Sequence, residues 1–360
     1  MNKKKILVVD DSALMRRVLC DIINSDEAFE VADRACNGLE AFDLISRNSY
    51  DAVVLDVNMP KMNGLQLLAE LRKFKIQVRV MMASTDTLEG AQTTMDALEL
   101  GALDFIHKPD SANSCRDGAF QSDFLRTLHG VVNSRPPVII DRAKERERRE
   151  ENKKFIGILQ RSPARIAGTK IVAIASSTGG PRALQSVVPR LPGNIDAPVL
   201  ITQHMPKGFT ASLAERLNST SEVKVVEAAE GLKLEKGTVY IAKGGVHMNV
   251  VKSGAEYKIH LSDEPIREGV KPCANYMFES LRECNYDKMV CVVLTGMGMD
   301  GTEGIKNLKD VKKAFVISQD EESSTIYGMP KAVAKAGLSD QVVPLDRVAS
   351  EIVLQVGLSS

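Results

Sequence analysis

Carboxylates, a serine and a lysine follow the short apolar runs of the first 110 residues at regular intervals. They are Asp10, Asp11, Asp56, Ser84 and Lys108. Three carboxylates in one crevice repel each other unless a cation neutralises them, and hard oxygen ligands of this kind suit Mg²⁺. A hydroxyl and a lysine at the same rim could hold phosphoryl oxygens, so that Asp56 would be the attacking carboxylate and would form an aspartyl phosphate. The alternative is that each residue is a polar strand end that faces water.

Ser177 could be a nucleophile of another kind. It follows an apolar run in the sequence SSTGGP (176–181), directly before a helical pattern. A serine on a sharp strand-to-helix turn is presented to substrate, and small residues beside it let the backbone bend tightly. The surrounding pattern, Ala-x-Ser-x-Gly, is one residue off the form found in hydrolases. A helix cap is the alternative, because serine and threonine are common at that position.

A nucleophilic serine needs a base and a carboxylate that orients the base. Of the five histidines, His204 directly follows an apolar run, and His247 lies in the glycine-rich loop KGGVHMNV (243–250). Asp300 follows a third apolar run, in LTGMGMDG (294–301). Polar groups at the ends of strands in one sheet can converge, so these residues are candidates for a triad with Ser177. For each histidine, the alternative is a structural role.

The glycines of the same LTGMGMDG segment also fit a dinucleotide fingerprint. Gly296, Gly298 and Gly301 match G-x-G-x-x-G after a strand, and Asp320 lies about twenty residues further on. However, the motif follows a late strand and does not form the first turn of the domain. Asp300 would also have no role inside it. A tight glycine loop, of the kind an oxyanion hole needs, explains the segment better.

The candidate phosphoryl-site residues of the first 110 positions are separated by alternating strand-like and helical patterns. The strand-like runs are Ile6–Val9, Val31–Arg34, Ala52–Leu55, Val78–Ala83 and Asp104–His107, and the helical patterns are Ser12–Ile23, Gly38–Ile45, Gly64–Phe74, Leu88–Leu100 and Phe120–Val132. Such alternation predicts βαβ units and a parallel sheet with helices on both faces. In open sheets of this class, sites lie at the carboxyl ends of the strands.

The residues of the second site follow a similar pattern. The predicted strands are Ile171–Ala175, Val199–Gln203, Val223–Glu227, Thr238–Ala242, Met289–Leu294 and Ala314–Ile317, and the predicted helices are Thr210–Leu217, Ala274–Arg282 and Met329–Ala336. Between the two patterns, residues 141–154 read DRAKERERREENKK, which is typical of a solvated linker. We therefore predict an α/β fold with a (βα)5 domain at 1–134, a linker at 135–168 and a doubly wound, mostly parallel α/β domain at 169–360.

The composition restricts the class of protein. The chain of 360 residues has 47 Lys+Arg and 47 Asp+Glu, without the basic excess of most nucleic-acid-binding proteins. The longest apolar runs fall far below the roughly 18 residues of a membrane span. The six cysteines contain no Cys-x-x-Cys pair, which suits reduced thiols. The basic N-terminus is followed by an apolar run too short for a signal peptide, so we expect a cytoplasmic protein.

Residues 1–134 resemble a response-regulator receiver domain. The matching blocks are VVDDS (8–12), LDVNMPKMNG (55–64) and FIHKPD (105–110). The resemblance implies that Asp56 accepts phosphate from a chemotaxis histidine kinase. It implies that Mg²⁺ is held by Asp10, Asp11, Asp56 and the Asn58 carbonyl, and that Ser84 and Lys108 contact the phosphoryl group. Phe105 would be the aromatic residue that changes rotamer between states.

Residues 170–357 resemble the catalytic domain of the chemotaxis protein-glutamate methylesterases. The matching blocks are AIASSTGGPRAL (173–184), LITQHMPKGFTASLAERL (200–217), GTVYIAKGGVHMNV (237–250) and VVLTGMGMDG (292–301). The resemblance implies that Ser177 is the nucleophile, His204 the base and Asp300 its orienter. The backbone N–H groups at Thr178 and Met297 would contribute to the oxyanion hole. In this family the unphosphorylated receiver covers the active site. Ser176 and Lys243 depart from the family pattern, but neither replaces a triad residue.

These resemblances imply a phosphorylation-regulated serine esterase without a cofactor for the ester reaction. Its substrates would be methylated glutamates of methyl-accepting chemotaxis receptors, and receptor glutamines would be deamidated by the same chemistry. No nucleic acid partner and no membrane insertion are expected. The alternative is a response regulator whose output domain only binds a protein. That class would be expected to lack a triad residue, and none is missing here.

Overall fold

The computed structural model describes residues 3–85, 88–109, 117–135, 150 and 167–359. The chain divides into two compact units, residues 1–139 and 140–360. The predicted linker, 135–168, lies almost entirely outside the described residues. No helix in the described ranges is long and apolar enough to cross a membrane.

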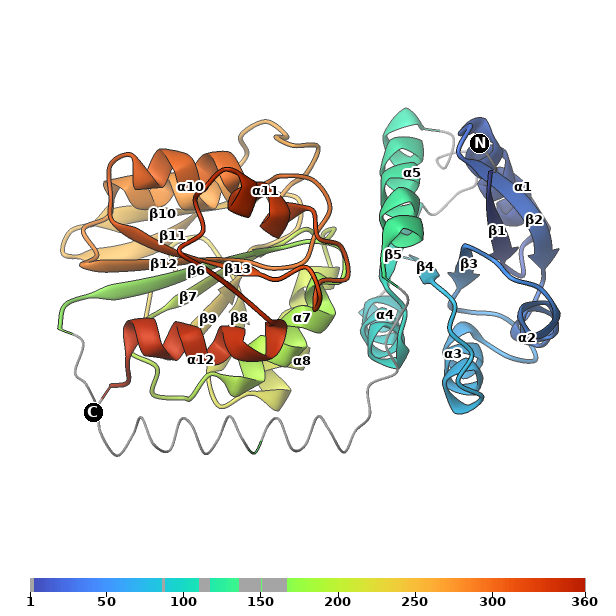
Figure 1. Ribbon diagram of the computed structural model, residues 1–360, viewed down its shortest axis with the longest axis horizontal. Helices are drawn as coiled ribbons and strands as arrows, with labels where there is room; N and C mark the ends of the chain where they lie inside the picture. Colours follow the sequence, from blue (N-terminus) through green and yellow to red (C-terminus); the bar gives the residue numbers. More distant parts are fainter. Residues whose placement is uncertain (1–2, 86–87, 110–116, 136–149, 151–166, 360) are drawn as a thin grey trace. The chain divides into compact units, whose positions relative to one another are not determined.

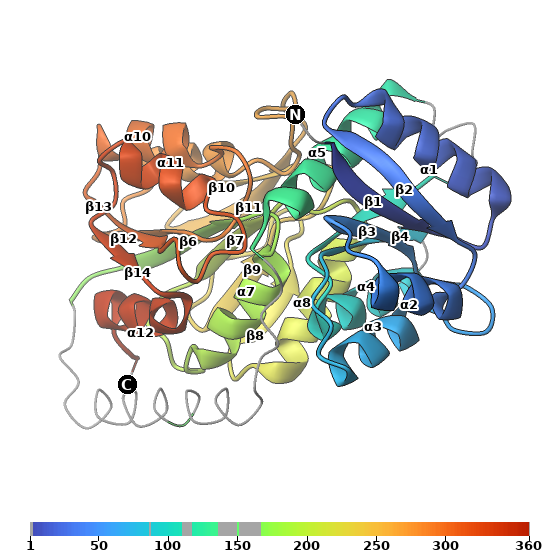
Figure 2. The ribbon, with the colours of Figure 1, turned by 45° about the vertical axis from the view of Figure 1, so that its right-hand side comes forward.

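The first unit is a five-stranded parallel sheet with the order β2-β1-β3-β4-β5. Its strands are β1 Lys4–Val9, β2 Phe29–Ala35, β3 Ala52–Asp56, β4 Val80–Thr85 and β5 Asp104–Lys108, and its helices are α1 Ala13–Ser25, α2 Gly38–Arg47, α3 Gly64–Lys73, α4 Leu88–Leu100 and α5 Gly118–Asn133. Helices α1 and α5 pack on one face of the sheet in a single apolar core, and α2, α3 and α4 lie together on the other face (Figures 1 and 2). The predicted (βα)5 architecture is confirmed.

Local sequence signals explain where these helices begin. Ser12, which the pattern placed inside the first helix, is instead its N-cap and accepts a hydrogen bond from the Met15 N–H. Asn63 caps α3 and forms a reciprocal capping box with Gln66. Strand β3 is buried along its whole length, as its continuous apolar sequence predicts.

The second unit is a seven-stranded sheet with the order β14-β13-β12-β6-β7-β9-β8, in which every pair of strands is parallel. Its strands are β6 Lys170–Ser176, β7 Val199–Gln203, β8 Lys224–Glu227, β9 Thr238–Ile241, β12 Lys288–Val293, β13 Ala314–Gln319 and β14 Gln341–Val343. Its helices are α7 Gly180–Val187, α8 Phe209–Thr220, α9 Ala274–Ser280, α10 Thr302–Lys309, α11 Met329–Lys335 and α12 Leu345–Val356, with 3₁₀ turns at Val188–Arg190 and Leu281–Glu283. The doubly wound, mostly parallel fold is confirmed.

The two faces of this sheet are covered by different sets of elements. Helices α9, α10 and α11 pack on one face, and α7, α8 and α12 lie on the other (Figure 1). An antiparallel hairpin of β10 His247–Ser253 and β11 Glu256–Ser262 joins the α9 face and its apolar core. The hairpin differs from the sequence analysis, which assigned KGGVHMNV to a loop. The glycines do form the turn, but the chain becomes extended at His247, where alternate residues such as Met248 and Val250 are buried.

Candidate active site and phosphorylation site

The strand register of the first unit brings its carboxylates together. Val9 of β1 pairs with Leu55 of β3, so the residues that follow, Asp10 and Asp56, leave the sheet side by side. One oxygen from each of Asp10, Asp11 and Asp56 lies within 4.8 Å of the others. Asp10 and Asp56 are buried, whereas Asp11 is exposed. This donor set of oxygens, open on one side, fits a divalent cation of the Mg²⁺ type.

Lys108, at the end of β5, is the cationic partner of this cluster. Its Nζ lies 2.6 Å from Asp56 Oδ1 and 3.0 Å from Asp10 Oδ2. Burial raises the pKa of the Asp56 carboxyl to about 6, against the opposing effect of the Lys108 charge. Burial alone would lower the pKa of Lys108, but the charges of Asp56 and Asp10 outweigh it and the pKa is raised. The lysine is therefore held in its charged form.

The remaining predicted residues of the receiver site have different surroundings. Ser84 is buried near the end of β4, one register position before the level of Lys108 on β5. Asn58 is exposed, two residues after Asp56. Phe105 is buried within β5. The contacts predicted for these three with a phosphoryl group or Mg²⁺ remain predictions.

The crowded carboxylates lead to a prediction about stability. We expect Asp56→Asn to raise the free energy of unfolding of the first unit by about 1–3 kcal/mol at pH 7.5 in EDTA. The folded pKa of Asp56 lies above the usual value of 3.8, so the carboxyl contributes stability that is fully present below pH 3.8. This contribution is lost as the pH rises through about 6, and the difference between variant and wild type should therefore vanish near pH 4.

Calorimetric unfolding of the full chain measures this difference, and Asp51→Asn is its matched control. Hydrogen bonds from the Lys5 N–H and Lys4, together with the Lys4 charge, lower the pKa of Asp51 in spite of partial burial. Its replacement should therefore destabilise the same unit. An Asp56→Asn variant that is less stable than wild type at pH 7.5 would contradict the prediction.

In the second unit, the ends of two neighbouring strands place Ser177 beside His204. Ser176 of β6 pairs with Gln203 of β7, and the His204 N–H donates to the Ser176 carbonyl over 3.1 Å. The Ser177 N–H donates to the Thr295 carbonyl over 3.0 Å, which joins the serine to the loop after β12. The chain then turns at Gly179, whose φ of 75° suits glycine, to begin α7. The predicted strand-to-helix turn is present.

Gln203 is a functional candidate that the sequence analysis missed. Its side chain is buried, and its Nε2 donates to the carbonyls of Ser177 and His204 over 3.0 and 3.1 Å. The Ser176 hydroxyl donates to its Oε1 over 2.6 Å. One amide thus ties the backbone of both candidate catalytic residues together. A glutamine at the end of an otherwise apolar strand was the available signal.

His204 and Asp300 form a buried pair. His204 Nε2 lies 2.7 Å from Asp300 Oδ2, and the Asp300 carboxylate also accepts hydrogen bonds from the N–H groups of Ala274 and Asn275, at the start of α9, and from the Cys273 thiol. Burial opposes ionisation of Asp300, but the hydrogen bond and charge of His204, with the other donors, outweigh it and lower the pKa to about 2. Asp300 is therefore ionised at neutral pH.

An ionised Asp300 determines which ring nitrogen of a neutral His204 carries the proton. A carboxylate only accepts, so Nε2 must be the donor, and Nδ1 keeps its lone pair. Nδ1 is thus the nitrogen that could accept a proton from Ser177. Within the described part of the chain, Ser177 Oγ forms no hydrogen bond, as is common for catalytic groups without substrate.

His247, the other candidate base, has both ring nitrogens occupied by the backbone. Its Nδ1 accepts from the Cys273 N–H over 3.1 Å, and its Nε2 donates to the Glu264 carbonyl over 3.1 Å. It is fully buried. This geometry favours the structural alternative for His247 and leaves His204 as the candidate base.

The glycine-rich loop after β12 packs directly against the candidate nucleophile. A Cβ at Gly296 would lie 2.7 Å from Ser177 Cβ and 2.4 Å from Met329 Sδ. The Gly301 N–H donates to Asn275 Oδ1 over 3.0 Å, which fixes the far end of the loop. Asp320 accepts from the N–H and hydroxyl of Ser323. Gly296 therefore allows close packing around Ser177, in agreement with the interpretation preferred over a dinucleotide site.

This close packing predicts that Gly296→Ala impairs the hydrolysis that the family resemblance implies. The new methyl group would have to displace Ser177 or Met329, and we expect kcat to fall by about 10²-fold, the effect of a misplacement of about 1 Å. Hydrolysis of the ester substrate at saturation measures it. Gly118→Ala is the control, because a Cβ there meets no atom within 4 Å. Wild-type kcat in Gly296→Ala would contradict the prediction.

The fold and both sites define a response regulator in which a receiver is joined to an α/β hydrolytic domain. Residues 6–117 match the family model of the response regulator receiver domain, and residues 172–352 match that of the CheB methylesterase. The chain therefore belongs to the CheB methylesterase family, and the resemblance proposed from sequence is confirmed.

Similar proteins agree with this assignment. The chain is 42% identical, over 98% of its length and 94% of the relative's, to the protein-glutamate methylesterase/protein-glutamine glutaminase of Pyrococcus abyssi. It is 40% identical, over 99% of its length and all of the relative's, to the protein of the same name from Geobacillus kaustophilus. The crystal structure of the Thermotoga maritima CheB methylesterase catalytic domain matches 52% of this chain and 99% of that one, with 39% identity and a TM-score of 0.51. A hydrolase is thus supported, and an output domain that only binds is not favoured.

Proposed function

We propose that this chain hydrolyses γ-methyl esters of glutamate on chemotaxis receptors, and deamidates receptor glutamines, with Ser177 as nucleophile. The observation that carries the proposal is the buried His204–Asp300 pair, at 2.7 Å, next to Ser177 at the carboxyl end of the sheet. The names of the similar proteins supply the substrate class. The chemistry needs no cofactor for the ester reaction.

In the proposed mechanism, His204 Nδ1 takes the proton of Ser177 Oγ as the oxygen attacks the ester carbonyl. Asp300 stabilises the imidazolium that forms. The N–H groups of Thr178 and Met297 stabilise the oxyanion; within the described chain, neither donates a hydrogen bond to another protein group. The tetrahedral intermediate collapses as His204 returns the proton to the leaving methoxide, which departs as methanol. Water then attacks the acyl-enzyme by the same route and releases glutamate; with an amide substrate, ammonia leaves instead.

We further propose that phosphorylation of Asp56 by a chemotaxis histidine kinase controls this activity. Receiver domains in general are phosphorylated with Mg²⁺, and the carboxylates of Asp10, Asp11 and Asp56 with the Asn58 carbonyl would hold the ion. When bound, Mg²⁺ would neutralise the carboxylates and the incoming phosphoryl oxygens. Lys108 and Ser84 would bind the phosphoryl group, and Asp56 would supply the attacking oxygen. We place the reaction in the cytoplasm.

The test is methanol and ammonia release from membranes that carry methylated or amidated receptors. We expect the full chain to release both products, and receptor-free membranes to release neither. A small phosphodonor with Mg²⁺ should increase the rate for wild type and leave Asp56→Asn unchanged. Absence of methanol from methylated receptors would overturn the assigned substrate. An equal response of Asp56→Asn to the phosphodonor would overturn the assigned control.

A further inference from the structure

Cys273 contacts the carboxylate that orients the candidate base. It is the N-cap residue of α9, it is almost fully buried, and its Sγ lies 3.0 Å from Asp300 Oδ1. Asp300 is ionised and has no proton to give, so the thiol must be the donor. Burial, followed by the charge of Asp300, raises the pKa of the thiol, which therefore keeps its proton at neutral pH.

The backbone of Cys273 is held in turn by His247. The ring accepts the Cys273 N–H at Nδ1 and donates from Nε2 to the Glu264 carbonyl. An N–H can only donate and a carbonyl can only accept, so the neutral tautomer with its proton on Nε2 satisfies both contacts. Burial and the nearby charge of Lys271 lower the pKa of His247, which agrees with a neutral ring. His247 thus fixes the cysteine without taking part in proton transfer.

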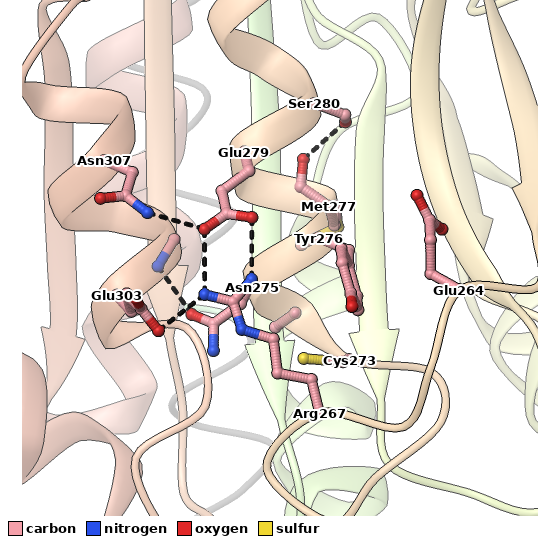
Figure 3. A network of polar contacts seen from close by, with 12 residues as sticks. Glu264, Arg267, Cys273, Asn275, Tyr276, Met277, Glu279, Ser280, Glu303 and Asn307 are labelled. Atoms are coloured by element: carbon pink, nitrogen blue, oxygen red, sulfur yellow. Dashed lines mark hydrogen bonds and ion pairs between the residues drawn. The ribbon is translucent and has the colours of Figure 1, made fainter.

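The elements around α9 make this arrangement rigid. The Tyr276 ring packs on the His247 ring with centroids 4.5 Å apart, and the Arg267 guanidinium lies 5.3 Å from the Tyr276 centroid. Arg267 forms a two-pronged ion pair with Glu279 of α9, and Glu279 also accepts from Asn307 of α10 (Figure 3). Figure 3 shows Cys273 next to this network, on the segment that leads into the helix. Helix α9 is therefore anchored at both ends, by Tyr276 near its start and by Glu279 near its end.

These contacts have a geometric consequence for Asp300. The thiol and the Asn275 N–H bind Oδ1, while the Ala274 N–H and His204 bind Oδ2. With two donors on each oxygen, the rotation of the carboxylate is fixed, and Oδ2 faces the imidazole. Loss of the thiol would leave Oδ1 with one donor. The carboxylate could then rotate, and His204 would lose part of its alignment.

We propose that Cys273, held in place by His247, is a positioning residue for hydrolysis, which acts by hydrogen-bonding Asp300 and thereby aligning His204. This inference rests on the proposed triad. It assigns a role to a thiol and an imidazole that the proposed mechanism does not itself use. Neither group touches the substrate. The substitution that best separates the role of the hydrogen bond from packing is Cys273→Ser, which keeps a donor and removes the sulfur.

The test compares the methanol-release kinetics and melting temperatures of full-length Cys273→Ala and Cys273→Ser. We expect Cys273→Ala to lower kcat by about ten-fold with an unchanged KM, as for loss of one hydrogen bond to a charged group. Cys273→Ser should restore kcat to within a few-fold of wild type. If Cys273→Ala melts below the assay temperature, Cys273→Val replaces it as the variant without a donor. Cys284→Ala is the matched control, because that thiol is equally buried but its only described hydrogen bond goes to the Ser280 carbonyl.

Each outcome has a defined meaning. A folded variant without a donor that keeps wild-type kcat overturns the inference, as does a serine variant that is as impaired as the alanine variant. A fall in melting temperature with wild-type kcat assigns Cys273 to stability alone and also overturns it. Ser177→Ala distinguishes these results from failure of the proposed function: if that variant is as active as wild type, the triad itself is wrong.

Discussion

Replacement of Ser177 by alanine should reduce kcat for methanol release by about 10⁴- to 10⁶-fold, the effect of removing a nucleophile from an established triad. In the proposed mechanism this hydroxyl forms the acyl-enzyme, and the hydroxyl of the neighbouring Ser176 is already bound to Gln203. The KM for receptor should change little, because the removed oxygen contributes to the reaction and not to receptor binding. Initial rates of methanol formation from methylated receptor membranes measure both constants.

Ser350→Ala is the matched control for this substitution. Ser350 is a buried serine of α12, which lies on the opposite face of the sheet from α10 and α11, and its hydroxyl donates to the Arg347 carbonyl of its own helix. The variant should hydrolyse at the wild-type rate. Ser176 would be a poor control, because its hydroxyl holds Gln203. If Ser177→Ala and wild type release methanol equally fast, the serine mechanism is wrong even though the family assignment stands.

The second large effect is expected for Asp300→Asn, which should lower kcat by about 10³- to 10⁴-fold. The four hydrogen bonds to Asp300 all require an acceptor, and an amide offers only one oxygen. If the amide nitrogen faces His204, the ring loses the partner that keeps the proton on Nε2. If the amide nitrogen takes the place of Oδ1, the Asn275 N–H at the start of α9 and the Cys273 thiol lose their acceptor. The first effect impairs catalysis directly, and the second lowers the melting temperature of the catalytic unit.

The pH dependence of this variant has a defined sign. The folded pKa of Asp300, about 2, lies below the usual value of 3.8, so the carboxylate stabilises the fold at pH values above 3.8. The contribution is lost as the pH falls through about 2. The stability difference between wild type and Asp300→Asn should therefore be constant above about pH 5 and should shrink in acid. Urea unfolding from pH 3 to pH 8 measures it, with the exposed Asp310→Asn as control. A difference that grows in acid would contradict the assignment.

Much of the fold could be predicted because the apolar runs of both units are short and separated by amphipathic stretches. The buried runs Ile6–Val9, Ala52–Leu55 and Ile171–Ala175 all form strands within a residue or two of the expected limits. The hairpin of β10 and β11 was missed because its first strand directly follows a glycine turn. Helices α10 and α12 were also not predicted. Helix α10 contains few apolar residues, so its pattern is weak, whereas the apolar residues of α12 (Val348, Ile352, Val353 and Val356) recur at helical spacing and were an available signal.

The candidate triad could be proposed because each of its residues follows a strand. Position in sequence could not decide between His204 and His247, since both have apolar neighbours. The folded structure distinguishes them, because the His204 ring contacts the Asp300 carboxylate, whereas the His247 ring contacts two backbone groups. The contacts of Gln203 and Cys273 are of the same kind. Gln203 contacts Ser177, which is 26 residues away, and Cys273 contacts Asp300, which is 27 residues away. A local sequence pattern therefore cannot predict these contacts.

The strand order of the second unit has a consequence for the point during synthesis at which the active site can form. Strand β6 lies between β7, the next strand in the chain, and β12, which is synthesised much later. His204 and Asp300 are 96 residues apart, so the long loop between them must close before they meet. A nascent chain that ends before β12 already contains the serine and the histidine, but it has neither the carboxylate nor the sheet neighbour that holds the serine. The catalytic unit can therefore hydrolyse its substrate only after β12 has joined the sheet, and nascent chains that lack this strand are inactive.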